Sequence, residues 1–313
     1  MLALLVIGGC AWAQSKDPPV PRDLLQNRRS VQGDAITFCI NPVTLAADFN
    51  RAVATEIAKA LLSKANFYDI KPFNKAQPLD YSFPLSDQEL LIYLSDFCEV
   101  FTGFNLTGNT YPEWLTFSRV YAHTRFVLAV TNPSYTRLED IPTDKAIGTR
   151  FISAADLRLV SHLQSLPENQ RLQRFPFFNN QILVEKLLDG TVEGIVIWEP
   201  ALLSALKGNP KAASVQVIST GNFQAPVIQF GMALRAKDTY LRTLLDQAID
   251  SLVKDGTIDR LMEQYGIPGK AGAVEEARQQ TSNTLVTALV VGLLIALFLV
   301  GSGWRKLRAR TRV

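Results

Sequence analysis

Short apolar runs alternate with segments of helical periodicity in the first third of the chain. AITFCI (35–40) is β-branched and aromatic, which predicts a strand, and FNRAVATEIAKALLSK (49–64) carries apolar residues at helical spacing. By the same criteria NFYDIKPF (66–73) predicts a strand, SDQELLIYLSDF (86–97) a helix and CEVFTGF (98–104) a third strand. This alternation predicts a parallel sheet covered by helices.

The same pattern starts again after about residue 124. The elements that it predicts there are the strands FVLAV (126–130) and KAIGTRF (145–151), the helix SAADLRLVSHLQSL (153–166), the strand RLQRFPF (171–177), the helix NQILVEKLLDG (180–190) and the strand VEGIVIW (192–198). A strand-rich segment, FQAPVIQFGMALRA (223–236), follows, and then the predicted helices 240–256 and 257–266. The chain therefore predicts two α/β lobes.

Two α/β lobes place their ligand-binding surface at the carboxyl ends of the parallel strands. The loops after Cys39, after Phe101 and after Ile197 are therefore expected to lie in a cleft between the lobes. Asn41 and Thr102 follow the first and third strands. Each is a candidate hydrogen-bonding residue for a ligand, or a residue that caps a local turn.

The segment GTRFISAAD (148–156) predicts a helix N-cap at Ser153, with Asp156 three residues further on. The backbone N–H groups of such a helix start, together with Arg150, would point toward the cleft and suit an anion. Capping alone also explains Ser153 and Asp156, and Arg150 is otherwise a surface charge.

Trp198 ends a predicted buried strand, so its ring stacks on a ligand, packs under a partner or belongs to the core. We expect it to be exposed in the cleft, because strand polarity directs the last residue toward the crevice. Glu199 is either a ligand-facing acid or a turn residue before Pro200. Phe117 and Tyr121 are candidate walls of the cleft, or core residues.

A segment of 21 residues without any ionisable side chain, 284–304, lies near the end of the chain. As a helix it would be about 32 Å long, which matches the hydrocarbon core of a bilayer. The tail 305–313 holds five cations and no acid, so the net charge of the rest is 3 − 5 = −2. By the positive-inside rule the tail is cytoplasmic, and the main body lies in the periplasm, joined to a bacterial inner membrane by a tether, 268–283. The charge of the main body gives no reason to expect nucleic-acid binding.

Residues 1–13 are expected to be a signal peptide, because a short apolar run ends in an A-x-A pattern. Acylation of Cys10 as in a lipoprotein is the alternative. A polar leader, 14–33, follows. Cleavage leaves Cys39 and Cys98 as an even pair in an oxidising compartment, where they form either a disulfide or two buried thiols.

Common catalytic and metal-binding motifs are missing from the sequence. His123 and His162 are the two histidines, and no CxxC, HExxH or paired-His spacing surrounds them, so no metal site is expected. CxxCH, GxSxG, GxGxxG and P-loop patterns are also missing, which disfavours a haem carrier, a typical serine hydrolase and a nucleotide enzyme. An enzyme with an unrecognised site stays open, because carboxylates such as Glu99 and Glu193 could pair across a cleft, although turns before strands also explain them. We expect no enzymatic activity and no cofactor.

Residues 34–267 resemble the type II periplasmic solute-binding proteins of family 3, which include amino-acid receptors of ABC transporters. The resemblance rests on AITFCINP…DFNRAVATEIAKAL, LTFSRVY, GTVEGIVIWEP and FGMALRAKDTYLRTLLDQAIDSLVKDGTIDRLMEQYG. It implies a two-lobed Venus-flytrap fold, with lobe 1 formed by 34–123 and 223–267 and lobe 2 by 124–222. It also implies that two crossover strands form a hinge and that a ligand closes the cleft.

Two departures from this resemblance bear on the ligand. The resemblance implies an arginine shortly before the FS-x-PY segment, to hold an α-carboxylate, but NTYPEWLTFSRVY has Tyr111 or Trp114 there. It also implies an acid for the α-amino group near the end of the strand in GIVIWEP, where Trp198 stands. We therefore expect a small ligand other than a standard amino acid.

A narrower resemblance is carried by CINP..L, FNR, FCEV, SRVYAHTRFV and IVIWEP. These segments are similar to binding-protein-like periplasmic components encoded beside quinoprotein (pyrroloquinoline quinone) alcohol and methanol dehydrogenases, which share paired cysteines and a Trp-x-Pro strand end. This resemblance implies an accessory role, with the dehydrogenase or a cytochrome as partner. Three functions stay open: capture of a small ligand for a transporter permease, docking to a periplasmic redox enzyme, or an enzyme with an unrecognised site, which the sparse catalytic residues disfavour.

Overall fold

The structure is a computed structural model that describes residues 34–71, 85–107 and 111–274. The expected signal peptide, leader, membrane helix and cationic tail lie outside these residues, as does the end of the expected tether. Within the described ranges, no helix is long and apolar enough to cross a membrane.

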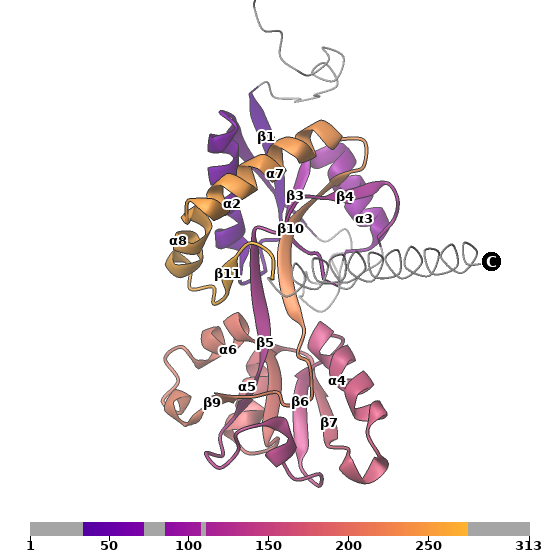
Figure 1. Cartoon of the computed structure of the whole chain (residues 1–313), viewed down its shortest axis with the longest axis vertical. Coiled ribbons are helices and arrows are strands. Elements are labelled where there is room, and N and C mark those ends of the chain that lie inside the picture. The colour runs from indigo at the N-terminus through magenta and orange to yellow at the C-terminus, as the bar shows by residue number, and fades with distance from the viewer. Residues whose placement is uncertain (1–33, 72–84, 108–110, 275–313) are drawn as a thin grey trace, which may run out of the picture.

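One continuous path of paired strands runs through the molecule, in the order β2-β1-β3-β10-β5-β8-β6-β7. The strands are β1 (Ala35–Ile40), β2 (Lys64–Asp69), β3 (Val100–Asn105), β4 (Leu115–Phe117), β5 (Ala122–Val130), β6 (Ala146–Arg150), β7 (Gln173–Phe177), β8 (Gly194–Trp198), β9 (Gln216–Ile218), β10 (Val227–Arg235) and β11 (Lys270–Ala271). Strands β1, β2 and β3 pair in parallel, as do β6, β7 and β8, which confirms the predicted arrangement in both lobes. The long strands β5 and β10 join the lobes (Figure 1).

Helices cover the sheet of lobe 1 on both faces. On one face α2 (Ala47–Ala60), α7 (Thr239–Lys254) and α8 (Thr257–Gln264) contribute apolar side chains to a large buried core. On the other face lie α3 (Asp87–Ile92) and the π-helical turn η1 (Tyr93–Phe97). The one helix expected here is therefore an α-helix that continues as a wider π-turn.

Three helices cover the sheet of lobe 2. Helix α4 (Ala154–Ser165) packs on one face, and α5 (Asn180–Leu188) and α6 (Glu199–Leu206) pack on the other. Helix α6 was not predicted, although Pro200 in its first turn suits a helix start. Three short 3₁₀ turns complete the described secondary structure: η2 (Leu138–Asp140), η3 (Glu168–Gln170) and η4 (Ala212–Ser214).

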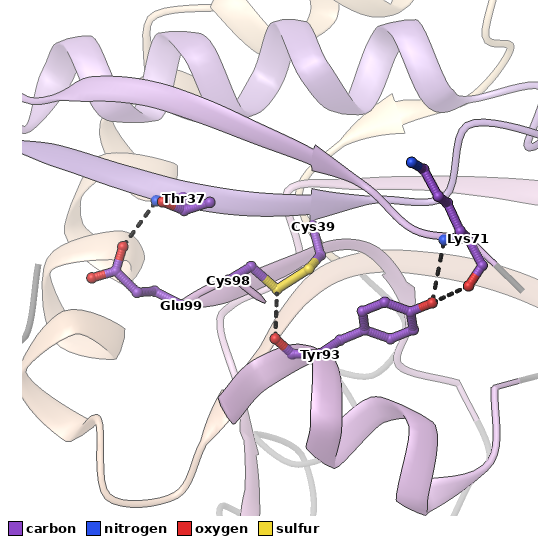
Figure 2. The surroundings of a disulfide bond; sticks show 6 residues. All are labelled: Thr37, Cys39, Lys71, Tyr93, Cys98 and Glu99. Carbon is purple, nitrogen blue, oxygen red and sulfur yellow. Dashed lines mark hydrogen bonds between the residues drawn. A yellow bond between two sulfur atoms is a disulfide. The ribbon is translucent and has the colours of Figure 1, made fainter. Parts of the chain in front are cut away.

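A disulfide joins Cys39, near the end of β1, to Cys98, just before β3, with Cα atoms 5.6 Å apart. The predicted disulfide is confirmed, and the alternative of two buried thiols is wrong. Figure 2 shows this corner of lobe 1, where the backbone N–H of Thr37 donates to the Glu99 carboxylate at 2.9 Å. The disulfide and this hydrogen bond both tie β1 to the segment that leads into β3.

Candidate ligand-binding site

The carboxyl ends of the parallel strands of both lobes lie at the hinge formed by β5 and β10. In lobe 2, β8 ends at Trp198, which pairs with Phe126 of β5, and β6 runs parallel to β8. In lobe 1, β3 ends at Asn105, which pairs with Phe230 of β10, and β1 runs parallel to β3. We call the ends of β1 and β3 the lobe 1 edge, and the ends of β6, β7 and β8 the lobe 2 edge. The two edges converge on the hinge (Figure 1), where open parallel sheets bind ligands.

Asn41 directly follows β1, whereas Thr102 lies inside β3 and does not follow it as expected. The two residues come close because Cys39 pairs with Phe101 in the parallel register. The side-chain oxygen of Asn41 accepts from the backbone N–H of Val43 at 3.3 Å, so Asn41 fills the local turn role. Thr102 is buried, and its hydroxyl has no hydrogen-bond partner among the described residues. The role of Thr102 as a hydrogen-bonding residue for a ligand stays a prediction.

Tyr121 belongs to the core of lobe 1 and is not a wall of a cleft. Its side chain is fully buried and donates a hydrogen bond to the side-chain oxygen of Asn50 at 2.8 Å. Burial raises the pKa of Tyr121 well above its ordinary value, although a hydrogen bond to the backbone of Gly103 opposes the shift. The tyrosine is thus a neutral, hydrogen-bonded part of the interior.

Phe117 is half-buried, and its position agrees with both roles that the sequence allows. Its ring lies 5.4 Å from Phe104 and 4.5 Å from Tyr111, measured between centroids. The Tyr111 hydroxyl donates to the carbonyl oxygen of Asn105, the last residue of β3, at 2.7 Å. This aromatic cluster therefore lies beside the lobe 1 edge.

At the lobe 2 edge Ser153 caps helix α4, as predicted, by accepting from the backbone N–H of Asp156 at 3.1 Å. Asp156 itself is buried and accepts from the backbone N–H of Ile152 at 3.0 Å. Arg174 of β7 donates to both oxygens of this carboxylate, at 2.7 and 2.8 Å. At the predicted anion-binding corner the N–H of Ile152 is therefore already bound by a carboxylate of the protein, and Arg150 lies half-buried beside it at the end of β6.

The pKa of Asp156 follows from these contacts. Burial alone would raise it, but hydrogen bonds from Arg174, from the Thr149 hydroxyl and from the Ile152 N–H outweigh burial and lower the pKa below its ordinary value. Asp156 is thus ionised and paired at neutral pH. It is not available to bind the ammonium group of a ligand.

Trp198 lies in the hinge. Its indole N–H donates to the hydroxyl of Thr124 at 2.7 Å, and its ring meets Phe230 edge-on with centroids 6.3 Å apart. The half-buried ring packs against apolar clusters of both lobes. The expectation of a cleft-exposed indole is therefore met only in part, since the ring is half-buried and its N–H is already paired.

Glu199 pairs with Arg125 of β5 through two hydrogen bonds of 2.9 and 3.2 Å. These hydrogen bonds raise the pKa of Arg125. Glu199 begins helix α6 and links it to the hinge strand, so it is more than a turn residue. Its partner is 74 residues away in the sequence. The hypothesis of a ligand-facing acid at Glu199 stays a prediction.

Glu99 and Glu193 do not pair across the hinge. Both precede strands, so each lies at the amino end of its sheet: Glu99 accepts from the Thr37 N–H, and Glu193 accepts from the Tyr135 hydroxyl at 3.1 Å. The carboxylate pair that left an enzyme open is therefore wrong. Across the part of the chain that the structure describes, no three His, Cys, Asp or Glu side chains gather as a set of metal ligands.

Sequence reasoning missed two kinds of residue at the site. The first kind is the long-range partner: Thr124 accepts from Trp198, and Arg125 and Arg174 bind carboxylates. These contacts form only when distant strands pair, so no local spacing in the sequence indicates them. The exposed aromatic residues Phe151 and Phe178, which follow β6 and β7, had a local signal, because Phe151 ends one predicted strand and Phe178 directly follows another.

No protein-family model matches the chain, and no curated protein is similar to it in sequence. Solved structures do match. The chain is similar to the L-cystine solute receptor of Neisseria gonorrhoeae in its unliganded open conformation, with a TM-score of 0.59 and 16% identity, over 80% of this chain and 99% of the receptor. It is also similar to the second substrate-binding domain of GlnP from Lactococcus lactis, with a TM-score of 0.56 and 15% identity, over 75% and 96% of the two chains.

A third similar structure is a substrate-binding protein of an ABC uptake transporter from Streptococcus pneumoniae with bound histidine. The TM-score is 0.51 and the identity 18%, over 76% of this chain and 94% of that one. These likenesses confirm the expected α/β periplasmic-binding-protein fold. The association with a quinoprotein dehydrogenase stays a prediction.

Proposed function

We propose that this protein captures a small solute between its two lobes and presents it to a membrane transporter, without catalysing a reaction. The observation that carries the proposal is the convergence of the two strand edges on a hinge of two strands, β5 and β10. The similar solved structures support it, because their names describe solute receptors and substrate-binding proteins.

The ligand that we propose is not a standard amino acid. The resemblance implies an acid near the end of β8 to hold an α-amino group, and Trp198 stands at that place. The next residue, Glu199, is an acid, but its carboxylate is held by Arg125. The buried carboxylate of Asp156 is likewise held by Arg174. Both of these carboxylates are thus already paired within the protein.

The location that we propose is the periplasmic side of a bacterial inner membrane, with residues 284–304 as the anchor and the tail in the cytoplasm. The Cys39–Cys98 disulfide supports this proposal, because stable disulfides are typical of oxidising compartments. A tethered receptor would act beside its permease and would not diffuse through the periplasm.

A thermal-shift screen tests the capture of a solute. The purified full chain is heated with each member of a library of small metabolites, which includes the twenty amino acids as one group. A ligand bound at a hundred times its Kd adds about 2.7 kcal/mol to the free energy of unfolding, which gives a shift of several degrees. If no metabolite shifts the melting temperature, solute capture is wrong.

A second candidate function is an accessory subunit of a periplasmic quinoprotein dehydrogenase. One observation favours it: the cysteines form a disulfide, and the resemblance to these accessory components includes paired cysteines. The test is affinity purification of the full chain from detergent-solubilised membranes, with mass spectrometry of co-purified proteins. Recovery of a dehydrogenase or cytochrome supports this candidate, whereas recovery of a permease supports the first.

A further inference from the structure

The lobe 2 edge exposes large apolar side chains at the place where a ligand would bind. Phe151 follows β6 and is 38% exposed, and Phe178 follows β7 and is 75% exposed. Their rings meet edge-on, with centroids 5.9 Å apart. Ile152 lies next to Phe151 and is 43% exposed. These three side chains form one apolar surface, which we call the phenyl lip.

The backbone holds Ile152 in an unfavourable conformation. Its φ angle is +57°, in the left-handed region that β-branched residues rarely adopt. The Ile152 N–H is fixed by the carboxylate of Asp156, which also binds Arg174. The hydrogen bond from the Ile152 N–H to Asp156 therefore stabilises the strained turn. Backbone strain of this kind is concentrated at active sites and ligand-binding sites.

Several polar groups near the phenyl lip are held by other groups of the protein. Ser153 caps α4 by accepting from the N–H of Asp156, and Asn179 caps α5 by accepting from the N–H of Ile182 at 2.8 Å. Asp156 is neutralised by Arg174. At the hinge end of the same edge, the Trp198 N–H is bound by Thr124. The large apolar side chains exposed at this edge are Phe151, Ile152 and Phe178.

The lobe 1 edge has related chemistry. The half-buried rings of Phe104, Tyr111 and Phe117 pack together beside the end of β3. The Tyr111 hydroxyl donates to the carbonyl of Asn105, so the cluster offers mainly its aromatic rings for contact with a ligand. Both edges that converge on the hinge thus carry aromatic groups.

We propose that the ligand is a small aromatic solute without an ammonium group, and that Phe151 and Phe178 of the phenyl lip contact its ring. This inference rests on the proposed function and narrows it to a substrate class. Burial of aromatic surface supplies the binding free energy, at about 25 cal/mol per Å² of apolar area, and edge-to-face ring contacts add to it. An ammonium group would be disfavoured, because its desolvation would not be repaid by an unpaired carboxylate at the lobe 2 edge.

Three probes that share a benzyl group test the substrate class. Benzyl alcohol is neutral, phenylacetate is an anion, and phenylalanine carries an ammonium group. Binding to the full chain is measured by calorimetric titration, with glutamine as a polar zwitterion. We expect benzyl alcohol or phenylacetate to bind at least about tenfold more tightly than phenylalanine, and glutamine not to bind. Tighter binding of phenylalanine or glutamine would overturn the substrate class and leave solute capture intact.

Variants test the place of binding. Phe178→Ser is expected to raise the Kd of the better probe by about tenfold or more, because the ring contact is lost. The matched control is Phe175→Ser, which makes the same change at a 45% exposed phenylalanine within β7, before the strand end. Its Kd should change less than about twofold.

Both variants leave buried residues in place, and their melting temperatures check that they fold. Equal losses in the two variants, or none in Phe178→Ser, would overturn the role of the phenyl lip. A metabolite from the general screen that binds tightly, while all three benzyl probes fail, overturns the aromatic class alone. Failure of every metabolite and every probe overturns solute capture and this inference together.

Discussion

The indole N–H of Trp198 and the hydroxyl of Thr124 form a 2.7 Å hydrogen bond inside the hinge. Thr124→Val keeps the shape of the side chain and removes the acceptor, so the half-buried indole N–H loses its partner. We expect the free energy of unfolding to fall by about 1–2 kcal/mol, measured by urea denaturation. Thr124→Ser retains the hydroxyl and should lose less. A valine variant as stable as the original chain would contradict the importance of this hydrogen bond.

The pairing of Asp156 with Arg174 predicts a pH dependence. The pKa of Asp156 is lowered in the folded protein, so its contribution to stability is present above about pH 4, the ordinary pKa, and is lost as the pH falls through the folded value. Arg174→Gln removes the main contact that offsets the cost of burying the ionised Asp156 carboxylate. We expect a loss of about 2–3 kcal/mol at pH 7, because a buried charge remains without its partner.

The difference in the free energy of unfolding between the original chain and Arg174→Gln should shrink as the pH falls from 7 to 3. The reason is that protonation of Asp156 removes the buried charge from the variant. Urea denaturation at a series of pH values measures this difference. Arg158→Gln is the control, since Arg158 is an exposed arginine of α4. A pH-independent difference for Arg174→Gln would show that the arginine acts only through packing.

Residues of local motifs were predictable, whereas their long-range partners were not. The cap at Ser153 follows from the spacing of Ser153 and Asp156, and the structure has it. The roles of Asp156 and Glu199 depend on Arg174 and Arg125, which approach only through the pairing of distant strands. An acid at a strand end therefore has the same sequence signal whether it faces a ligand or an arginine of the protein.

The Cys39–Cys98 disulfide is the covalent link between two neighbouring strands of lobe 1. In the chain-entropy account, a cross-link over a separation of 59 residues stabilises the folded state by about 4 kcal/mol. We expect the double variant Cys39→Ala and Cys98→Ala to lose about this free energy in urea denaturation. Reduced original chain should unfold at the same midpoint as the double variant. Equal midpoints for the oxidised chain and the double variant would contradict the prediction.

Helices and strands with a clear hydrophobic periodicity were predicted from the sequence. Elements that depend on neighbouring parts of the fold were not. The strand AITFCI and the helix that follows it appear as β1 and α2. Helix α6 was missed because its eight residues are apolar on most sides and directly follow a strand. The π-turn η1 was missed because it continues the apolar spacing of α3. Strand β11 has two residues and exists only through its pairing with β5.

The proposed anchor is tested on the whole molecule. The full chain, expressed with its own amino terminus, should stay in the membrane pellet after an alkaline carbonate wash, because a helix of 21 apolar residues buries about 30 Å of hydrocarbon length. A chain that ends at residue 274 keeps all the described residues and should be released into the supernatant. Release of the full chain would contradict the anchor.

The two lobes are joined by β5 and β10, and the ring of Trp198 packs against clusters of both lobes at this junction. A ring in that position couples the unfolding of one lobe to that of the other, because neither core can open without losing the contact. The chain enters lobe 2 through β5 and returns through β10, so lobe 1 is built from two separate parts of the sequence. We therefore expect cooperative unfolding of both lobes.

Trp198→Ala should break this coupling. We expect the melting temperature to fall, with a loss of about 3 kcal/mol, and calorimetry to resolve two transitions where the original chain shows one. Trp114→Ala is the control, because Trp114 packs only against the α3-side cluster of lobe 1 among the described cores. That variant should destabilise lobe 1 and keep a single transition. A single transition in Trp198→Ala, with equal calorimetric and van't Hoff enthalpies, would place the coupling in the strands β5 and β10 themselves.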